Sequence, residues 1–306
     1  MHWARIGEVG FAGGMRVLFA VYRVCGRWPF RLALYPVIAW YVLVHAAARQ
    51  SSREYLTRLF ERTGGATPAP TLANVFRHFF AFGETLLDKL RAWSGETDWA
   101  VEIHGDEIAR ELTRSGRGAV LVTAHLGNLE LFRMLGSKLP DVRITVLAHT
   151  LNAQRFNALM ASVNPASALD MVQVSTLDPQ TAILLSERIE QGGFVVIAGD
   201  RVPLDPAAPT IAQDFLGARA HFPLGPYVLA SLLRCPLIAM LNSQRDGRFH
   251  FSLTQLADKV VLPRGNRAAP AESLAARYVA LLEAECRAAP FQWFNFFPFW
   301  AERKTA

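Results

Sequence analysis

The feature that most constrains the fold is a regular alternation of short apolar runs and helical segments that begins after Trp99. The runs are rich in β-branched residues and bounded by turn residues, as strands are: Val101–His104, Ala119–Thr123, Arg143–Ala148, Met171–Val174, Phe194–Ala198, Pro236–Leu241 and His250–Leu253. Helical patterns follow several of them: Asp106–Arg114, Leu129–Lys138, Ala153–Ser162, Asp178–Gln191, Pro226–Leu233 and Glu272–Ala288. Strands that alternate with helices predict an α/β fold, with a mainly parallel or mixed sheet flanked by helices.

The first 95 residues differ, because arginines are mixed into long apolar stretches there. Residues 1–62 contain nine arginines, no lysine and three acids, and 9 − 3 = +6 equals the net charge of the whole 306-residue chain. Leu32–Ala48 is uncharged over 17 residues, which is short of the ~20 that span a bilayer. We therefore predict an N-terminal helical, membrane-associating region over 1–95, whose apolar helix lies in the interface or under the domain. A transmembrane helix over residues 32–48 is the alternative. Residues 96–306 would form the α/β core, integrated with that region into one domain.

Charge and cysteine content narrow the choice of partner and compartment. The N-terminal arginines alternate with apolar side chains and no nucleic-acid motif is present, so an anionic membrane surface fits them better than nucleic acid. The three cysteines have no paired spacing, which suggests neither a disulfide framework nor a zinc site. This pattern favours a reducing, cytoplasmic environment.

The chemically most informative stretch is 118–133. An apolar run ends there in His125, and Gly127-Asn128 then opens a helical pattern, so His125 is expected at the carboxyl end of a strand. Ligands bind at that edge of open α/β sheets. Glu130 follows in an H-x4-E spacing, which lets its carboxylate fold back onto the imidazole and leave the other ring nitrogen as a general base. A strand-end histidine near a helix-capping glutamate would explain the spacing as well.

Two further stretches carry candidate binding residues. Gly199-Asp200-Arg201 ends another apolar run, so Arg201 could grip a phosphate or a pantetheine thioester while Asp200 orders the loop. A structural Asp–Arg pair that closes a turn is the alternative. Gly225 lies among small residues and prolines that would let a ligand chain approach the backbone, although a tight turn explains them equally. Residues 201–220 are expected to form a loosely structured loop.

Several kinds of catalytic machinery are absent from the sequence. It contains no G-x-S-x-G elbow, no P-loop, no G-x-G-x-x-G after a strand and no H-E-x-x-H. The histidines other than His125 show no metal-ligand spacing. A serine hydrolase, a nucleotide-driven enzyme and a zinc hydrolase are therefore disfavoured, and we expect neither a cofactor nor a metal.

Four blocks occur in a familiar order: H-x4-E after a strand, Gly-Asp-Arg at a strand end, Phe-Leu-Gly…Phe-Pro-Leu-Gly-Pro, and a closing Pro-x-Gln-Trp-Phe. Together they resemble the lysophospholipid acyltransferase superfamily, and within it the late lipid A lauroyl/myristoyl acyltransferases, over most of the chain. The resemblance implies that His125 is the general base and Glu130 its carboxylate partner. It also implies that Asn128 lies beside them, and that Asp200 and Arg201 belong to the substrate-binding edge.

These observations predict an acyltransferase that moves a fatty acyl group from a thioester to a hydroxyl of a lipid or glycolipid. The donor would be acyl carrier protein or coenzyme A, and the amides of Gly127 and Asn128, or else Arg201, would receive the thioester oxygen. We expect the protein at the cytoplasmic face of a bacterial inner membrane, attached peripherally or monotopically. A non-catalytic lipid-binding protein on the same scaffold and a thioesterase are the alternatives, and the identity of the acceptor stays open.

Overall fold

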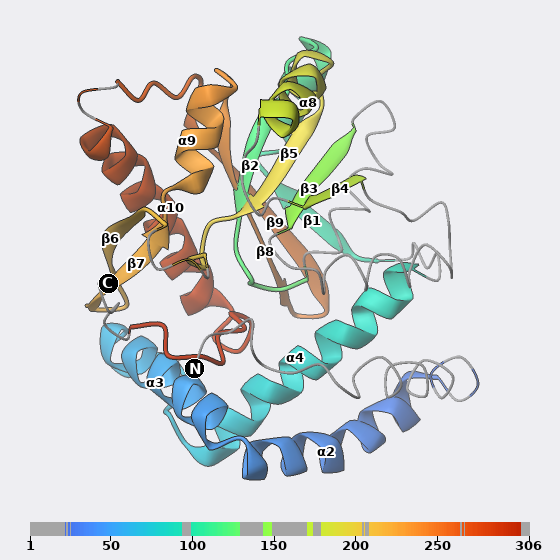
Figure 1. Ribbon diagram of the computed structural model, residues 1–306. Coiled ribbons are helices and arrows are strands. Elements are labelled where there is room, and N and C mark those ends of the chain that lie inside the picture. Colours follow the sequence, from blue (N-terminus) through green and yellow to red (C-terminus); the bar gives the residue numbers. More distant parts are fainter. Residues whose placement is uncertain are drawn as a thin grey trace.

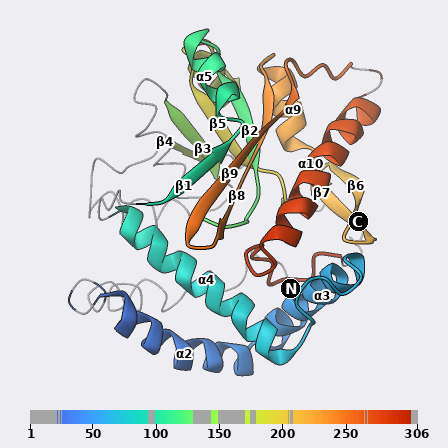
Figure 2. The same ribbon diagram turned by 180° about the vertical axis from the view of Figure 1, so that it is seen from behind.

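The fold is a seven-stranded sheet with helices on both faces and a group of helices at one end (Figures 1 and 2). The computed structural model describes residues 22, 24, 26–93, 99–128, 143–148, 170–173, 179–203, 205, 208–263, 265 and 267–300. The sheet has the order β1-β9-β8-β2-β5-β3-β4. Its strands are β1 (Val101–His104), β2 (Ala119–Thr123), β3 (Ile144–Ala148), β4 (Asp170–Gln173), β5 (Phe194–Ala198), β8 (Leu237–Arg245) and β9 (Arg248–Ala257).

The pairing within this sheet is parallel everywhere except in the β8–β9 hairpin. All five residues of β2 are buried, as expected for a central parallel strand covered on both sides. Alternate residues of β2 enter two separate hydrophobic clusters: Val120 and Val122 enter one, and Ala119 and Leu121 enter the other. The predicted α/β fold with a mixed, mainly parallel sheet is confirmed.

Helices cover both faces of the sheet. α5 (Asp106–Arg114) contributes buried residues to one cluster. α8 (Pro179–Glu190), α9 (Gly225–Leu232) and α10 (Ala268–Ala288) contribute to the other. The expected helices Leu129–Lys138 and Ala153–Ser162 lie outside the described residues.

The expected loop over 201–220 is partly wrong, because β6 (Thr210–Phe215) and β7 (Ala218–Pro223) form a separate antiparallel pair. Leu216 and Gly217, which connect them, have φ angles of 51° and 78°. Two successive positive φ values match the twist of a tight hairpin turn. Leucine rarely adopts such a backbone, so this turn could not be predicted from the residue types.

Three N-terminal helices lie together below the carboxyl ends of β2 and β5 (Figures 1 and 2). They are α2 (Arg27–Val44), α3 (Ala46–Arg62) and α4 (Leu72–Trp93). Buried residues of α2, α3 and α4 belong to the same hydrophobic cluster as α9 and α10. The boundary predicted between a helical region ending at 95 and a core beginning at 96 stays a prediction.

No single helix in the described part of the chain has the length and composition to cross a membrane. The pair Trp28–Val44 and Ala46–Arg62 meets the test only when both helices are taken together, and it is bent by 96°.

Candidate active site

The site begins where two neighbouring strands end. In the parallel pair β2–β5, Thr123 is in register with Ala198. His125 and Asp200 each follow two residues later, so they leave the sheet side by side. The Nδ1 atom of His125 lies 2.8 Å from Oδ1 of Asp200, and the backbone N–H of His125 donates to Oδ2 over 2.8 Å. The two strand ends therefore bring an imidazole and a carboxylate together.

Gly199 makes this approach possible. Its N–H donates to the carbonyl of Thr123 over 2.7 Å, and the hydroxyl of Tyr278 donates to the same carbonyl over 2.7 Å. A Cβ atom at Gly199 would lie 2.5 Å from the Cγ2 of Val122, closer than two carbon atoms can pack. A glycine at this position is therefore what allows the β5 end to lie against the β2 end.

Asp200 is 1% exposed. Burial by itself raises the pKa of this carboxyl, but the charge of His125, the hydrogen bonds from it and the charge of Arg201 together hold the pKa below its ordinary value. Asp200 is thus an ionised carboxylate that can only accept hydrogen bonds. In neutral His125 the proton must then sit on Nδ1, which leaves the lone pair on Nε2. The His125 side chain is 29% exposed, so a substrate can approach the ring.

A C-terminal tripeptide, Gln292-Trp293-Phe294, runs antiparallel to the His125 loop. Phe294 N–H donates to the His125 carbonyl over 2.9 Å, and Gly127 N–H donates to the Gln292 carbonyl over 2.9 Å. The indole N–H of Trp293 donates to Oδ2 of Asp200 over 3.1 Å. The His125 loop is thus held by a segment far along the chain.

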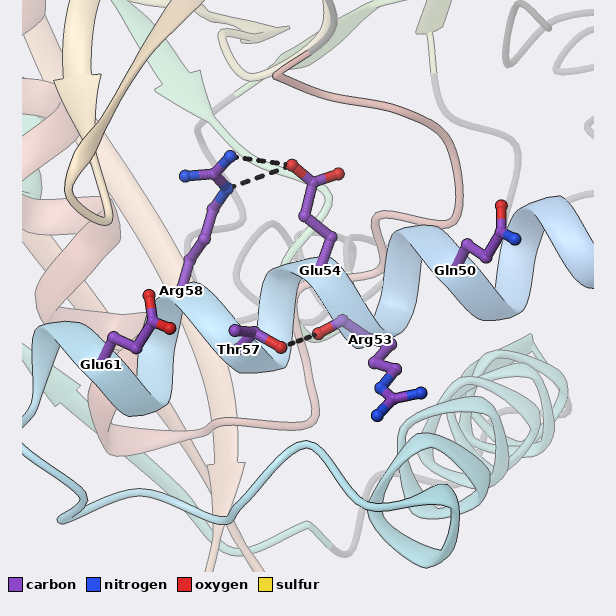
Figure 3. A pocket seen from close by; sticks show the side chains of 6 residues that line it. All are labelled: Gln50, Arg53, Glu54, Thr57, Arg58 and Glu61. Atoms are coloured by element: carbon purple, nitrogen blue, oxygen red, sulfur yellow. Dashed lines mark hydrogen bonds and ion pairs between the residues drawn. The ribbon is translucent and has the colours of Figure 1, made fainter.

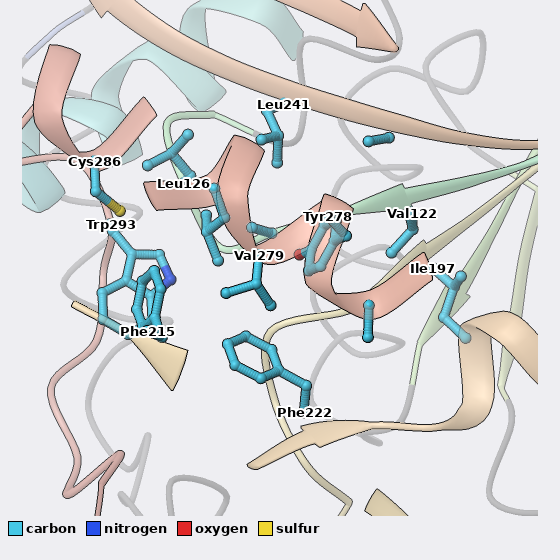
Figure 4. Packing of buried hydrophobic residues seen from close by; sticks show 14 of the residues in the cluster. Val122, Leu126, Ile197, Phe215, Phe222, Leu241, Tyr278, Val279, Cys286 and Trp293 are labelled. Atoms are coloured by element: carbon cyan, nitrogen blue, oxygen red, sulfur yellow. The ribbon is translucent and has the colours of Figure 1, made fainter. Parts of the chain in front are cut away.

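The same tripeptide is itself anchored to β8 and the aromatic core. The side-chain amide of Gln292 accepts from the Gln244 N–H over 2.7 Å and donates to the Gln244 carbonyl. Figure 4 shows the Trp293 ring beside Phe215 and close to Leu126; the Trp293 and Phe215 ring centroids are 5.1 Å apart. Sequence reasoning noticed this stretch only as part of a resemblance and assigned no role to Trp293.

Gly127 and Asn128 lie in the turn after His125. Gly127 has a φ of 63°, and a Cβ there would lie 2.3 Å from the carbonyl oxygen of Asn242, so the turn requires glycine. Its N–H is bonded to Gln292, and the Asn128 N–H donates to Oδ1 of Asn242 over 2.8 Å. Both amides are thus occupied within the chain, and a thioester oxygen would have to displace a hydrogen bond to reach either one.

Arg201 lies next to Asp200 and is half-buried. It donates to the Phe294 carbonyl over 3.0 Å, and its guanidinium carbon lies 5.6 Å from the centroid of the Phe297 ring. Burial lowers its pKa, while the charge of Asp200 opposes that change. An arginine keeps its charge across the physiological range, so this residue places a cation beside the Asp200 carboxylate.

Two other predicted residues are not joined to this arrangement by the described contacts. Glu130 lies outside the described residues, so its pairing with His125 stays a prediction. Gly225 begins α9 directly after β7, and a Cβ there would meet nothing within 4 Å. Its role in ligand binding also stays a prediction.

Neither the two described cysteines nor the hollow along α3 competes with His125. Burial raises the pKa of the Cys235 thiol to about 11 and that of Cys286 further still, so neither is a ready nucleophile. A hollow of about 390 Å³ lies along α3, lined by charged and polar side chains of that helix alone (Figure 3). None of the predicted site residues lines it.

Comparison with known proteins identifies the family of the chain. The family model for the bacterial lipid A biosynthesis acyltransferases matches residues 16–302. No curated protein matches the chain. The matched region holds the β2 and β5 ends, the N-terminal helices and the Gln292–Phe294 segment. The chain belongs to the bacterial lipid A biosynthesis acyltransferase family.

Proposed function

We propose that this acyltransferase moves a fatty acyl group from an acyl thioester to a hydroxyl of a lipid or glycolipid, with His125 as the general base. The observation that carries the proposal is the 2.8 Å contact between His125 Nδ1 and a buried, ionised Asp200. This contact directs the lone pair of Nε2 outward from a partly exposed ring at the carboxyl edge of the sheet.

The reaction balances without a covalent enzyme intermediate. Nε2 of His125 takes the hydroxyl proton as the oxygen attacks the thioester carbonyl, and a C–O bond forms. The tetrahedral intermediate then collapses, the C–S bond breaks, and the imidazolium returns the proton to the departing thiolate. Asp200 stabilises the imidazolium between these steps, and such base catalysis contributes ~10²–10⁴-fold. Arg201 is the described cation closest in sequence to the site, and we assign it to the thioester oxygen or to the phosphate of the donor.

The donor is acyl carrier protein or coenzyme A, both of which present an acyl thioester on a phosphopantetheine arm. The experiment that tests the function incubates the purified protein with each radiolabelled acyl donor and a bacterial membrane lipid extract. We expect the label in a lipid product, and no transfer by His125→Ala with an unchanged circular dichroism spectrum. A near-native rate in that variant would refute the role of His125. Free fatty acid as the main product would indicate a thioesterase, and donor binding without turnover would indicate a binding protein.

We also propose that the outer face of α2 lies in the cytoplasmic surface of the bacterial inner membrane. Phe30, Leu34, Ile38 and Val42 recur with helical spacing and are buried. The other face is apolar too, and its large side chains stand in solvent: Trp28 73% exposed, Leu32 66%, Trp40 68% and Leu43 71%. Large exposed apolar patches mark interaction sites, and tryptophan is favoured at the lipid–water interface. A monotopic attachment of this kind would place the carboxyl edge of the sheet towards the lipid.

A further inference from the structure

A buried polar network connects the N-terminal helices to His125. It begins at Ser52 of α3, whose hydroxyl lies 2.9 Å from Nδ1 of His78 in α4. Nε2 of His78 lies 2.9 Å from the carbonyl oxygen of Trp293, and the Trp293 indole reaches Asp200. Ser52, His78, Trp293 and Asp200 are each no more than 1% exposed, so water does not compete for these bonds.

The chemistry of the partners fixes the proton positions along this network. A carbonyl oxygen only accepts, so His78 donates from Nε2 to Trp293, and Nδ1 accepts from the Ser52 hydroxyl. Burial lowers the pKa of His78 to about 4, although its bond to the Trp293 carbonyl opposes that shift. His78 is therefore neutral and held in a single tautomer, with both ring nitrogens engaged.

At the other end, the Asp200 carboxylate receives hydrogen bonds on both oxygens. Oδ1 accepts from Nδ1 of His125, while Oδ2 accepts from the His125 backbone and from the Trp293 indole. Two fixed N–H donors on Oδ2 prevent rotation of the carboxylate, so Oδ1 stays aimed at the imidazole. The charged and titratable groups that act on Asp200, or on which it acts, are His125, Arg201, Tyr278 and Cys286.

We propose that Trp293 and His78 are positioning residues for His125, through which α3 and α4 hold the Asp200 carboxylate in line with the imidazole. The inference rests on the proposed role of His125 as the base. It adds that α3, α4 and the C-terminal segment together set the geometry of the catalytic pair. Neither Trp293 nor His78 touches the reacting atoms.

The test compares two tryptophan-to-phenylalanine variants. Trp293→Phe keeps a ring in the pocket but removes the N–H that Asp200 accepts. Trp300→Phe is the matched control, because its indole N–H also donates one hydrogen bond, in this case to the backbone carbonyl of Phe215 over 3.2 Å, and its ring contacts the same aromatic cluster. Each variant loses one indole hydrogen bond and the same volume, and only one of them loses contact with Asp200.

We expect Trp293→Phe to lower kcat about tenfold with the KM of the acyl donor within about twofold. The acid limb of its kcat/KM profile should also move up by roughly half a pH unit to one unit. Without the indole donor, Asp200 accepts more strongly from His125 and favours the imidazolium, so a higher pH is needed to free the base. Trp300→Phe should keep the acid limb of the wild-type profile. A Trp293→Phe profile that overlays that of Trp300→Phe would overturn the role of Trp293.

His78 is tested by a conservative and a non-conservative replacement. His78→Gln places an amide N–H near the position of Nε2, so we expect it to restore most of the rate, whereas His78→Leu should lose about as much as Trp293→Phe. A folded His78→Leu protein with wild-type kcat would remove His78 from the inference. If His125→Ala itself stays active, the proposed function fails. If His125→Ala is inactive while Trp293→Phe matches Trp300→Phe, only the inference about positioning fails.

Discussion

Replacement of Asp200 by asparagine should remove the base without disturbing the fold. The substitution keeps the shape of the side chain but turns one oxygen into an NH₂ group. Oδ2 faces two donors that cannot reverse, the His125 backbone N–H and the Trp293 indole. Among the described residues, Oδ1 accepts a hydrogen bond only from the imidazole. The amide oxygen must therefore remain at the Oδ2 position, and the NH₂ group turns towards His125. Nδ1 then has to accept, which moves the ring proton onto Nε2.

The size of the effect follows from this tautomer exchange. A histidine protonated on Nε2 has no lone pair directed at the substrate hydroxyl, so the full contribution of base catalysis is lost, ~10²–10⁴-fold in kcat. That loss corresponds to about 2.7–5.5 kcal/mol of activation free energy. The KM of the donor should change little, because Asp200 is buried. The assay is transfer of a radiolabelled acyl group into lipid, followed from pH 5 to pH 9 (roughly one unit beyond the usual range of a histidine on each side).

Asp214→Asn provides the control, because this carboxylate is 79% exposed on β6 and pairs only with Arg219 at 3.6 Å among the described residues. It should leave the rate unchanged. An Asp200→Asn protein that is folded and retains more than about a tenth of the wild-type kcat would refute the tautomer argument. Glu130→Gln belongs in the same series. If Asp200 holds Nδ1, Glu130→Gln should cost less than Asp200→Asn, whereas the reverse order would restore the sequence-based pairing.

Two further predictions concern stability and membrane attachment. The pKa of His78 is depressed to about 4 in the folded protein. As pH falls from ~6.5 to 4, the unfolded chain therefore gains a proton on His78 before the folded chain does, and the free energy of unfolding decreases by about 3 kcal/mol in all. Thermal melts should show a smaller acid-induced drop in Tm for His78→Gln than for the wild type. The double variant Leu32→Glu/Leu43→Glu should abolish flotation with anionic vesicles, because the full burial of each leucine in an apolar phase contributes about 1.5–3 kcal/mol. The control is the double variant Ile183→Glu/Val261→Glu, whose positions are 61% and 63% exposed elsewhere on the surface, and it should leave flotation intact. Equal losses of flotation in the two double variants would contradict a specific role of α2.

The strands and their parallel arrangement could be predicted from the sequence, because buried central strands are short, β-branched and separated by helical patterns. The β6–β7 hairpin could not, since its turn depends on a leucine at positive φ. The strand order could not be predicted from the sequence either. Alternation predicts a sheet but does not say that β2 lies beside β5, and that neighbourhood is what pairs His125 with Asp200.

The sequence therefore predicts which residues lie at strand ends but does not predict which of them contact one another. His125, Asp200 and Arg201 follow apolar runs, which is a local signal. The H-x4-E spacing predicts Glu130 as the partner of His125, because spacing can point only to a carboxylate nearby in sequence, whereas the described carboxylate partner is 75 positions away. Trp293 carries no local signal at all. The polar end of β8, which includes Asn242 and Gln244, is the signal that could have shown that another segment docks there.

The separation of these contacts along the sequence also determines at which stage of folding the site forms. Trp293 reaches Asp200 across 93 positions and His78 reaches Trp293 across 215. Contacts of such separation form only after the loop-closure entropy of the intervening chain has been overcome. The carboxylate can be aimed at His125 only when the C-terminal segment is seated between the sheet and α4, because that segment supplies one of the two donors on Oδ2. A chain that has folded its sheet but not yet docked residues 292–294 would have both members of the pair, joined only by the contacts of His125 itself. Helix α4 holds this segment through His78, so the docking of the C-terminal segment onto α4 also completes the hydrogen bonds of the catalytic pair.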